Sequence, residues 1–564
     1  MTTATTSRPT LIPAHIRRHL TGLLPGPADL APMRTSWRRD LIAGVTVGVV
    51  ALPLALAFGV SSGLGASAGL ITAIVAGVVA AIFGGSHVQV SGPTGAMAVV
   101  LAPVVATHGP HAVVVVSVIA GVILVAAGAL RLGRVVVYIP WPVIEGFTAG
   151  IALVIALQQV PLALDTSTPT GERTLLAAYD AVRLADWSHA WLPLTITLGV
   201  VILVEALRRL PGSLPGALIA VVAATAVAEV AGLPVARIGE LPSSLPMPRI
   251  PLIDPSILSE LAGPALAVAA LAAIESLLSA RVAAGMAPTG RVLPDREVFG
   301  QGLASIASGL FGGMPATGAI ARTAVNVRAG ARSRLSAVTH AVLLTAVVTF
   351  GSGLASRIPL SALAGVLIAT TLHMVNLREV RGLWRLGRST TATFVVTIAC
   401  TVLLDLLTAV EVGLVLAAFF ALRALAGTTH VAPQELPGPA RPGDEHIALL
   451  RLEGSLFFGA ADRVMDDIAD ADAWVVVLRL SRVELLDPTG AHRLAEIVRL
   501  LEARGVTVLI KGLRNRHQRM AARAGVLEAL RTREHVFDDL DTAVAHARSH
   551  VSRQLAGQPV PRRR

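Results

Sequence analysis

The sequence predicts a polytopic α-helical membrane protein with a small soluble α/β domain at its C-terminal end. Of the 564 residues, 54% are hydrophobic and 15% are charged, whereas soluble proteins carry about a quarter charged residues. The apolar residues form uncharged runs such as 41–60, which match the about 20 residues that a helix needs to cross the hydrocarbon layer. After residue 427 the composition becomes that of a soluble domain.

Fourteen apolar segments are predicted to span the membrane within a transmembrane domain at 40–427, which follows a cytoplasmic N-terminal segment at 1–39. The third and tenth segments are short. The fourteen segments are 41–62, 66–84, 93–107, 111–131, 141–163, 190–207, 214–232, 261–282, 297–311, 317–329, 334–355, 358–375, 390–406 and 408–426.

Arginine clusters predict the orientation of these segments, because cytoplasmic loops retain Lys and Arg. Six arginines lie in the first 40 residues, and further clusters follow the fourth, sixth, eighth, tenth and twelfth segments. Every cluster follows an even-numbered segment, so both termini are expected in the cytoplasm and the protein in the cytoplasmic membrane. The net charge of +11 then reflects loop arginines, and nucleic acid is not expected as a partner.

The region after the last segment is predicted to hold a proline-rich linker at 428–443, an α/β domain at 444–548 and a basic tail at 549–564. The linker contains four prolines between His430 and Gly443. Strands and helices alternate in the domain. Strands are predicted at 447–452, 474–480 and 506–510, and a helix is predicted at 460–471. A second helix carries Leu494, Ile497, Val498 and Leu501 on one face. No phosphate-binding glycine loop and no cluster of metal ligands is evident, so neither a cofactor nor a metal is expected.

Two stretches of the transmembrane domain, 83–96 and 311–322, resemble each other. In each, Phe-Gly-Gly is followed by proline and then by Thr-Gly-Ala, which opens a short apolar helix. They lie in the third and tenth segments. Because these segments are seven apart, the two halves of the domain have opposite orientations, which indicates two inverted seven-span repeats.

Glycine and proline in these stretches predict two helices that are broken near the middle of the membrane, where such breaks line a cavity. Each half-helix would begin with unpaired backbone N–H groups and the positive end of its dipole. Two such ends facing each other can hold an anion, and Arg322, one turn into the second half-helix, would add positive potential. The alternative is that the Gly and Pro residues only kink packed helices.

Glu275 lies in the middle of the eighth apolar segment, where an acidic group costs on the order of 3 kcal/mol on insertion scales. Ser279 follows one helical turn later on the same face. We interpret Glu275 and Ser279 as an ion-coupling site, with a proton as the expected coupling ion and Na⁺ as the alternative. A structural hydrogen bond from Glu275 to a neighbouring helix is the competing interpretation.

Over about residues 38–548, the sequence resembles the SulP sulfate-permease family of anion transporters with a C-terminal STAS domain. The resemblance rests on the motifs at 40–48, 90–97, 144–150, 274–279 and 317–323. It implies that the two repeats form a core domain and a gate domain, usually in a homodimer. It also implies elevator-type secondary active transport of a small anion, with sulfate expected first and bicarbonate or a dicarboxylate next.

The same resemblance implies which residues surround the anion. They are Leu54, Phe58, Thr94, Gly95, Ala96, Gly318, Ala319, Ile320, Ala321 and Arg322. Leu54 stands where many relatives carry Gln, which leaves the identity of the anion open. An anion channel and a non-transporting anion sensor that signals through the STAS domain are the alternative functions. An enzyme is not expected, because the soluble part lacks a nucleophile–base pair.

Thr489 lies in the STAS-like domain, in Asp487-Pro488-Thr489-Gly490 before a predicted helix. It matches the position where single-domain STAS proteins carry a phosphorylated hydroxyl, so it is a candidate regulatory site, and a regulatory protein is a candidate partner there. The same four residues also make a sound helix cap, which is the structural alternative.

Overall fold

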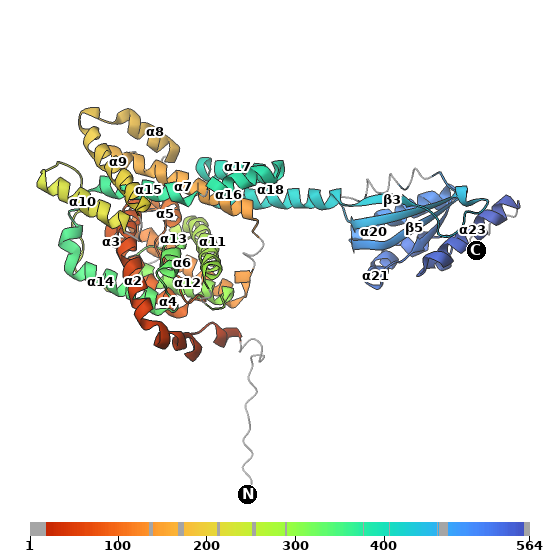
Figure 1. The fold of residues 1–564 in the computed structure, drawn as a ribbon, viewed down its shortest axis with the longest axis horizontal. Coiled ribbons are helices and arrows are strands. Elements are labelled where there is room, and N and C mark those ends of the chain that lie inside the picture. The colour runs from red at the N-terminus through yellow and green to blue at the C-terminus, as the bar shows by residue number, and fades with distance from the viewer. Residues whose placement is uncertain are drawn as a thin grey trace, which may run out of the picture. The chain divides into compact units, whose positions relative to one another are not determined.

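The computed structural model describes residues 19–134, 139–166, 174–210, 215–250, 255–287, 290–375, 377–404, 406–458, 461, 468 and 472–557. The chain divides into two compact units, with the boundary between Leu414 and Val415. The first unit consists of helices and two very short strands, and the second unit is built on a five-stranded sheet (Figure 1). The two units are described separately below.

The first unit begins with the long helix α2, and a π-helical turn at Thr72–Ala76 joins α3 to α4. The described elements are α2 (Pro27–Ser61), α3 (Ala66–Ile71), α4 (Gly77–Phe83), β1 (Ser91–Gly92), α5 (Gly95–His108), α6 (Pro110–Ala129), α7 (Trp141–Leu164), α8 (Thr174–Leu184), α9 (Trp187–Arg209), α10 (Gly216–Val230), α11 (Pro255–Met286), α12 (Pro294–Leu310), β2 (Thr317–Gly318), α13 (Ile320–Arg328), α14 (Leu335–Ala355), α15 (Leu360–Met374), α16 (Leu377–Leu386), α17 (Arg388–Leu403) and α18 (Leu406–Gly427).

Each of the fourteen predicted segments overlaps a helix of the structure. Among the described residues, nine helical stretches are long and apolar enough to cross a membrane, and α5, α10 and α17 are shorter apolar helices. The remaining two segments correspond to α12 and α13. A helical multi-pass membrane architecture is therefore confirmed, while the number of crossings and their orientation stay predictions.

Small residues let the helices around the chain breaks approach closely. A Cβ atom added to Gly302 of α12 would lie 2.6 Å from the carbonyl oxygen of Gly121 on α6, and one added to Gly121 would lie 2.7 Å from that of Gly302. Helices α2 and α3 are equally close: a Cβ atom added to Gly69 of α3 would lie 1.9 Å from the carbonyl oxygen of Ala55 on α2. These contacts pack α6 against α12 and α2 against α3.

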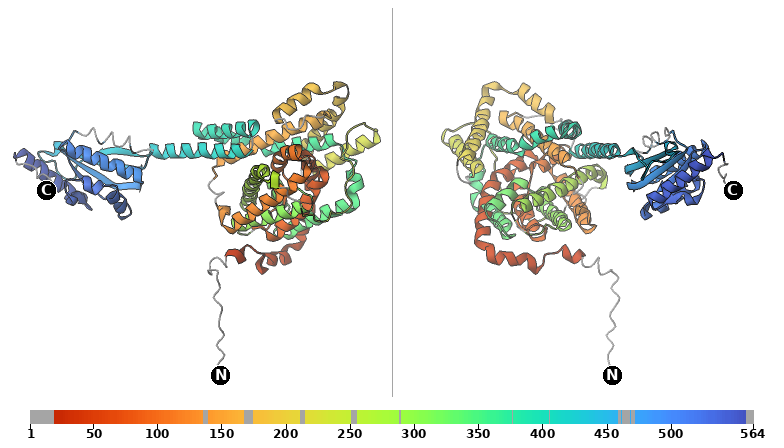
Figure 2. Two further views of the ribbon diagram at one scale, coloured as in Figure 1. Left: turned by 180° about the vertical axis from the view of Figure 1, so that it is seen from behind. Right: turned by 45° about the vertical axis from the view of Figure 1, so that its right-hand side comes forward.

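The second unit is a sheet of order β3-β4-β5-β6-β7, antiparallel between β3 and β4 and parallel elsewhere. Alternate residues of β5 point to opposite faces of the sheet, and α20 to α22 cover one face while α23 covers the other (Figure 2). The elements are β3 (His430–Gln434), β4 (Ile447–Leu456), β5 (Val475–Leu486), α20 (Pro488–Ala503), β6 (Thr507–Lys511), α21 (Asn515–Arg523), α22 (Val526–Ala529), η4 (Arg533–His535), β7 (Val536–Phe537) and α23 (Leu540–Leu555). The predicted helix at 460–471 lies almost entirely outside the described residues.

Three boundaries differ from the sequence-based domain limits. Helix α2 begins at Pro27, inside the predicted N-terminal segment, because the Asp29 carboxylate caps it by accepting from the Gly26 N–H at 2.8 Å. Strand β3 lies inside the predicted linker; it is an edge strand, where Pro433 is tolerated. Helix α23 continues into the predicted tail and buries Val551 against the sheet.

Candidate functional site

The two repeated stretches meet in the structure through a short antiparallel strand pair. β1 pairs with β2 so that Ser91 lies opposite Gly318 and Gly92 opposite Thr317. The Ala319 N–H then donates to the Val90 carbonyl at 2.9 Å. Helix α5 starts just after β1 and helix α13 just after β2, so the N-terminal ends of both short helices are brought to one place. This is the arrangement that the repeat predicted for the two half-helix starts.

Helix α11 contacts both half-helices through one face. The half-buried Glu275 accepts a hydrogen bond from the Thr94 hydroxyl at the start of α5, 3.0 Å away. One turn later, the Ser279 hydroxyl donates to Thr323 of α13 at 2.9 Å. Glu275 and Ser279 therefore share a face, as expected, but each contacts a different half-helix.

Ser276, which sequence reasoning did not single out, links α11 to β2. Its hydroxyl accepts from the Gly318 N–H at 2.9 Å and lies 3.0 Å from the Thr317 hydroxyl. The sequence shows Ser276 within the motif at 274–279, but it does not show which distant residues Ser276 contacts. Ser276 positions β2, and with it the start of α13.

Arg322 lies in the first turn of α13 and is 2% exposed. Its Nη2 group donates to the Pro93 carbonyl, just before the start of α5. Its Nη1 group is buried and has no hydrogen-bond partner among the described residues. The charges of Arg322 and Glu275 act on each other. A buried, positively charged donor thus lies between the two helix starts, beside an acidic group.

Apolar residues of two other helices close the space around the start of α5. Leu54 and Phe58 of α2 are 8% and 6% exposed. A Cβ atom on Gly95 would lie 3.1 Å from a Phe58 ring atom and 2.1 Å from Cδ1 of Ile155 on α7. Phe58 is therefore where the resemblance expects it, and Ile155 is an additional neighbour. Ala96 and Ala319 are buried, whereas Ile320 and Ala321 are exposed.

Glu297 in the first turn of α12 supports β1 from behind and was not predicted from the sequence. It is 1% exposed and accepts four hydrogen bonds: from the N–H groups of Gly85 and Ser86 at 2.7 and 3.0 Å, and from the side chains of Gln89 and Gln301 at 2.8 and 2.9 Å. Gln301 also donates to Ser91 in β1 at 2.6 Å. In the sequence Glu297 looks like an ordinary charged residue at a helix start.

We predict that Glu297→Gln lowers both the thermal stability and the transport activity of the protein. The variant replaces one acceptor oxygen by an NH₂ group that faces donors, and each buried donor left without an acceptor costs about 1–3 kcal/mol. Melting of the detergent-solubilised protein checks this, with Glu260→Gln as the control, since Glu260 is exposed and pairs with His108 at 2.8 Å. An unchanged melting temperature would contradict the supporting role of Glu297.

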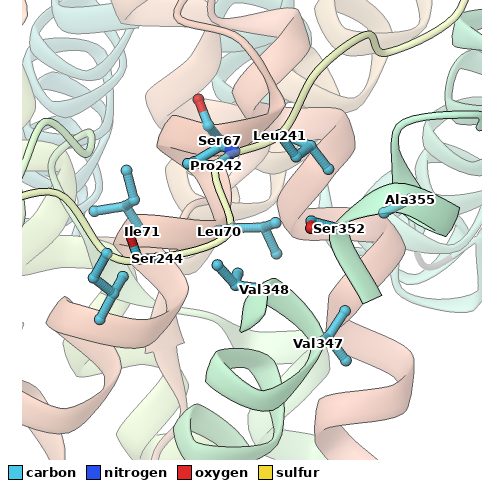
Figure 3. A pocket seen from close by; sticks show the side chains of 11 residues that line it. Ser67, Leu70, Ile71, Leu241, Pro242, Ser244, Val347, Val348, Ser352 and Ala355 are labelled. Carbon is cyan, nitrogen blue, oxygen red and sulfur yellow. The ribbon is translucent and has the colours of Figure 1, made fainter. Parts of the chain in front are cut away.

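A separate small pocket lies between α3, α14 and the loop that follows α10 (Figure 3). It is lined mainly by apolar side chains, among them Leu70, Ile71, Leu241 and Val348. None of the predicted site residues lines it, so it does not compete with the helix starts as the functional site.

Thr489 is exposed at the second position of α20. The Asp487 side chain caps this helix by accepting from the Gly490 N–H at 2.6 Å. The capping function proposed for these residues is therefore present, and it leaves the Thr489 hydroxyl accessible.

The architecture defines a class of protein: a multi-pass membrane protein with two short helices that start at one buried polar site, joined to a STAS-type α/β unit. The sulfate permease family model matches residues 37–397, and the STAS domain model matches residues 439–543. The chain belongs to the sulfate permease family. Since the relatives are named as transporters, the expectation that the chain is not an enzyme is confirmed.

Individual relatives agree with this assignment. The putative sulfate transporter YvdB of Bacillus subtilis is 33% identical over 515 residues, which cover 90% of this chain and 97% of that protein. The transmembrane domain of a cyanobacterium bicarbonate transporter, BicA, is 30% identical with a TM-score of 0.60, over 68% of this chain and 97% of that one. The murine Solute Carrier 26 family member A9 anion transporter shares the fold, with a TM-score of 0.79, 18% identity, and coverage of 96% and 97%.

Proposed function

We propose that the chain is a secondary active transporter that carries a small oxyanion, with sulfate first and bicarbonate second, across the cytoplasmic membrane. The observation that carries the proposal is the meeting of the α5 and α13 N-termini at the β1–β2 pair, where Nη1 of Arg322 has no hydrogen-bond partner within the described part of the chain. Helix N-termini and a guanidinium group both favour anions. The names of two relatives, a putative sulfate transporter and a bicarbonate transporter, supply the two substrates. A dicarboxylate is the third candidate.

We further propose that a proton is the coupling ion and that Glu275 carries it. Its carboxylate contacts Thr94 at one helix start and interacts electrostatically with Arg322 at the other. An ionised Glu275 beside the anion would repel it, whereas a protonated Glu275 would not. Binding a proton and binding an anion would therefore favour each other, which is the requirement for symport. Na⁺ is the alternative coupling ion.

We propose that transport follows an elevator-type alternating-access mechanism. Two inverted seven-span repeats would form a core domain that slides against a gate domain. The protein would be a homodimer, with both termini of each chain in the cytoplasm. The STAS-type unit would act as a regulatory domain, and phosphorylation of the exposed Thr489 would add negative charge at the N-terminus of α20, where the helix dipole favours it. A regulatory protein would then recognise that surface.

The test of this function is the uptake of labelled sulfate into proteoliposomes, with and without an inward proton gradient. Saturable uptake that the gradient stimulates is the expected result. Bicarbonate and fumarate should be assayed in the same vesicles as competitors, because the stronger competitor identifies the preferred anion. Binding of all three without any flux would instead favour the anion sensor.

Counter-flow separates the transporter from a channel. Preloading the vesicles with unlabelled anion should accelerate labelled uptake by an alternating-access carrier, because the loaded carrier returns faster than the empty one. Uptake that neither saturates nor responds to preloading would contradict the transporter and support an anion channel.

A further inference from the structure

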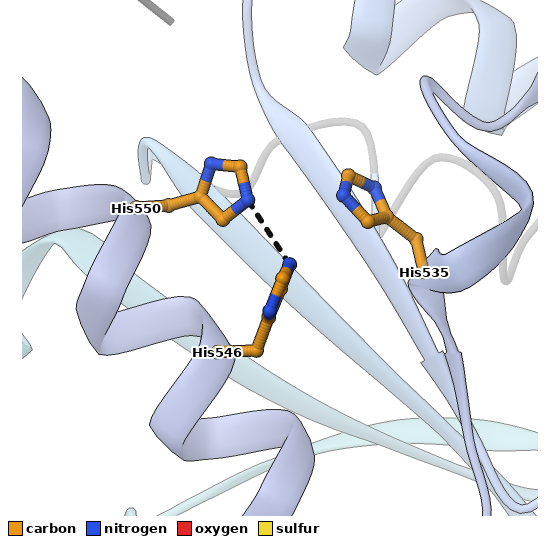
Figure 4. A group of neighbouring side chains, drawn as sticks. All are labelled: His535, His546 and His550. Carbon is orange, nitrogen blue, oxygen red and sulfur yellow. Dashed lines mark hydrogen bonds between the residues drawn. The ribbon is translucent and has the colours of Figure 1, made fainter. Parts of the chain in front are cut away.

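Three histidines gather in the second unit, and the proposed transport function uses none of them. His535 ends the short helix η4, just before β7, while His546 and His550 lie one turn apart on α23. Figure 4 shows the three rings directed toward a common point between α23 and the end of η4. They come together because α23 buries Ala543, Ala547 and Val551 against the sheet, which turns the adjacent face of the helix toward β7.

The separations of the ring nitrogens suit a single metal ion. One nitrogen of each ring lies within 4.8 Å of one nitrogen of each of the others. The Nε2 atoms of His546 and His550 are 3.2 Å apart. Two nitrogens bound at about 2.0–2.1 Å to a tetrahedral Zn²⁺ stand about 3.3 Å apart. Two of the three ligands are therefore already at about the required spacing, and His535 offers a ring nitrogen within 4.8 Å of both rings.

Two of the three rings are buried, and the third is half-buried. His535 is 3% exposed and His550 7% exposed, and Nδ1 of His535 is buried without a hydrogen-bond partner among the described residues. Imidazole nitrogens are among the commonest metal ligands in proteins.

The charged groups that face the cluster come from η4, the residues before it and α23. Arg531 and Arg553 act on the rings from these two sides, and Arg531 is paired with Glu502 at 3.1 Å. Glu534, next to His535, places a negative charge near His546. The positive groups weaken the attraction for a cation, while Glu502 and Glu534 partly offset them.

We propose that His535, His546 and His550 bind one divalent transition-metal ion, of which Zn²⁺ fits best, and that the ion ties α23 to the β7 edge of the sheet. Imidazole ligands suit Zn²⁺, and a site with three protein ligands leaves one position for water. From the sequence we expected no metal site in this domain. The spacing of 11 and 4 residues is not a standard metal motif, and only the i, i+4 pair on α23 was a signal.

The competing explanation is that the rings simply pack together. Their centroids lie 4.9–5.4 Å apart, and Phe537 lies 5.3 Å from His546. A neutral pair could also share one N–H···N hydrogen bond between His546 and His550. This explanation predicts no specific affinity for metal and no effect of metal on the stability of the unit.

The experiment uses the full-length chain, purified in detergent without a polyhistidine tag and stripped with a chelator. Co²⁺ is titrated while the visible spectrum is followed, and Zn²⁺ is titrated by calorimetry. His546→Gln is the main variant because His546 is only half-buried, so its replacement disturbs the core least; His550→Gln is the second. His492→Gln is the control, since His492 is exposed on α20 and pairs with Glu496 at 3.3 Å, apart from the three-histidine cluster.

We expect one equivalent of Co²⁺ to give the intense spectrum of a tetrahedral site, and Zn²⁺ to displace it and to raise the melting temperature of the protein. His546→Gln should weaken Zn²⁺ binding at least about 100-fold, since even the outer partners of metal ligands contribute about 10–100-fold. The His492→Gln control should bind like the unaltered chain. The proposal is wrong if His546→Gln binds Zn²⁺ as tightly as that control, or if no tetrahedral spectrum appears.

Discussion

Replacing Glu275 by Gln should abolish the stimulation of anion uptake by a proton gradient while leaving uptake down an anion gradient measurable. Gln keeps an oxygen that can accept from Thr94, which donates to Glu275 at 3.0 Å, so the start of α5 should stay in place. The glutamine side chain does not titrate, so no charge can be gained or lost at this position beside Arg322. A gradient of one pH unit corresponds to about 1.4 kcal/mol per transported proton, or about a tenfold accumulation ratio, and this tenfold effect should disappear.

The control for this experiment is Glu260→Gln, which makes the same chemical change on the same helix. Glu260 is exposed and pairs with His108, away from the helix starts, so its variant should respond to the gradient as the unaltered protein does. If Glu275→Gln accumulates anion as steeply as the control, Glu275 does not carry the coupling ion, and its bond to Thr94 is structural. Repeating the assay with a sodium gradient then tests the alternative ion.

Replacing Gly95 by Ala should weaken anion binding by at least about tenfold, the effect of about 1.4 kcal/mol lost from the bound state. Gly95 is the first residue of α5, so an added methyl group would enter the space at the helix start where we propose that the anion binds. It would also lie 2.1 Å from Cδ1 of Ile155 and 3.1 Å from the Phe58 ring. Competition of unlabelled sulfate against labelled uptake measures the change in affinity.

A double variant separates the two effects of that methyl group. Ile155→Val removes the Cδ1 atom, so in Gly95→Ala/Ile155→Val the shortest contact with this side chain of α7 lengthens from 2.1 to 3.0 Å, while the methyl group still occupies the helix start. We expect the double variant to remain defective. Full recovery would mean that Gly95 matters only for packing of α5 on α7, and that the anion does not bind there. Gly199→Ala is the control, because no atom of the described residues lies within 4 Å of a Cβ at that position of α9.

Much of the transmembrane unit follows from local properties of the sequence. Apolar runs determine where helices form, because a backbone in lipid must satisfy its own hydrogen bonds. The repeated Phe-Gly-Gly and Thr-Gly-Ala stretches likewise mark where two helices break, and α5 and α13 begin at Gly95 and Ile320, as the two repeats predicted. In the second unit, short buried runs predicted where β4, β5 and β6 begin, although β4 and β5 continue to Leu456 and Leu486, beyond the predicted ends at 452 and 480.

Only the tertiary structure decides which polar groups become partners. Glu297 bonds to Gly85, 212 positions away, and Ser279 finds Thr323 rather than sharing a partner with Glu275. Periodicity shows which face of a helix is buried, but not the register in which two distant helices pack. Periodicity also does not reveal β3, which lies within the predicted linker. An edge strand that contains a proline is recognised by its pairing with β4 and not by its composition. It also explains the histidine cluster: His535 joins His546 and His550 only because the sheet brings the end of η4 beside α23.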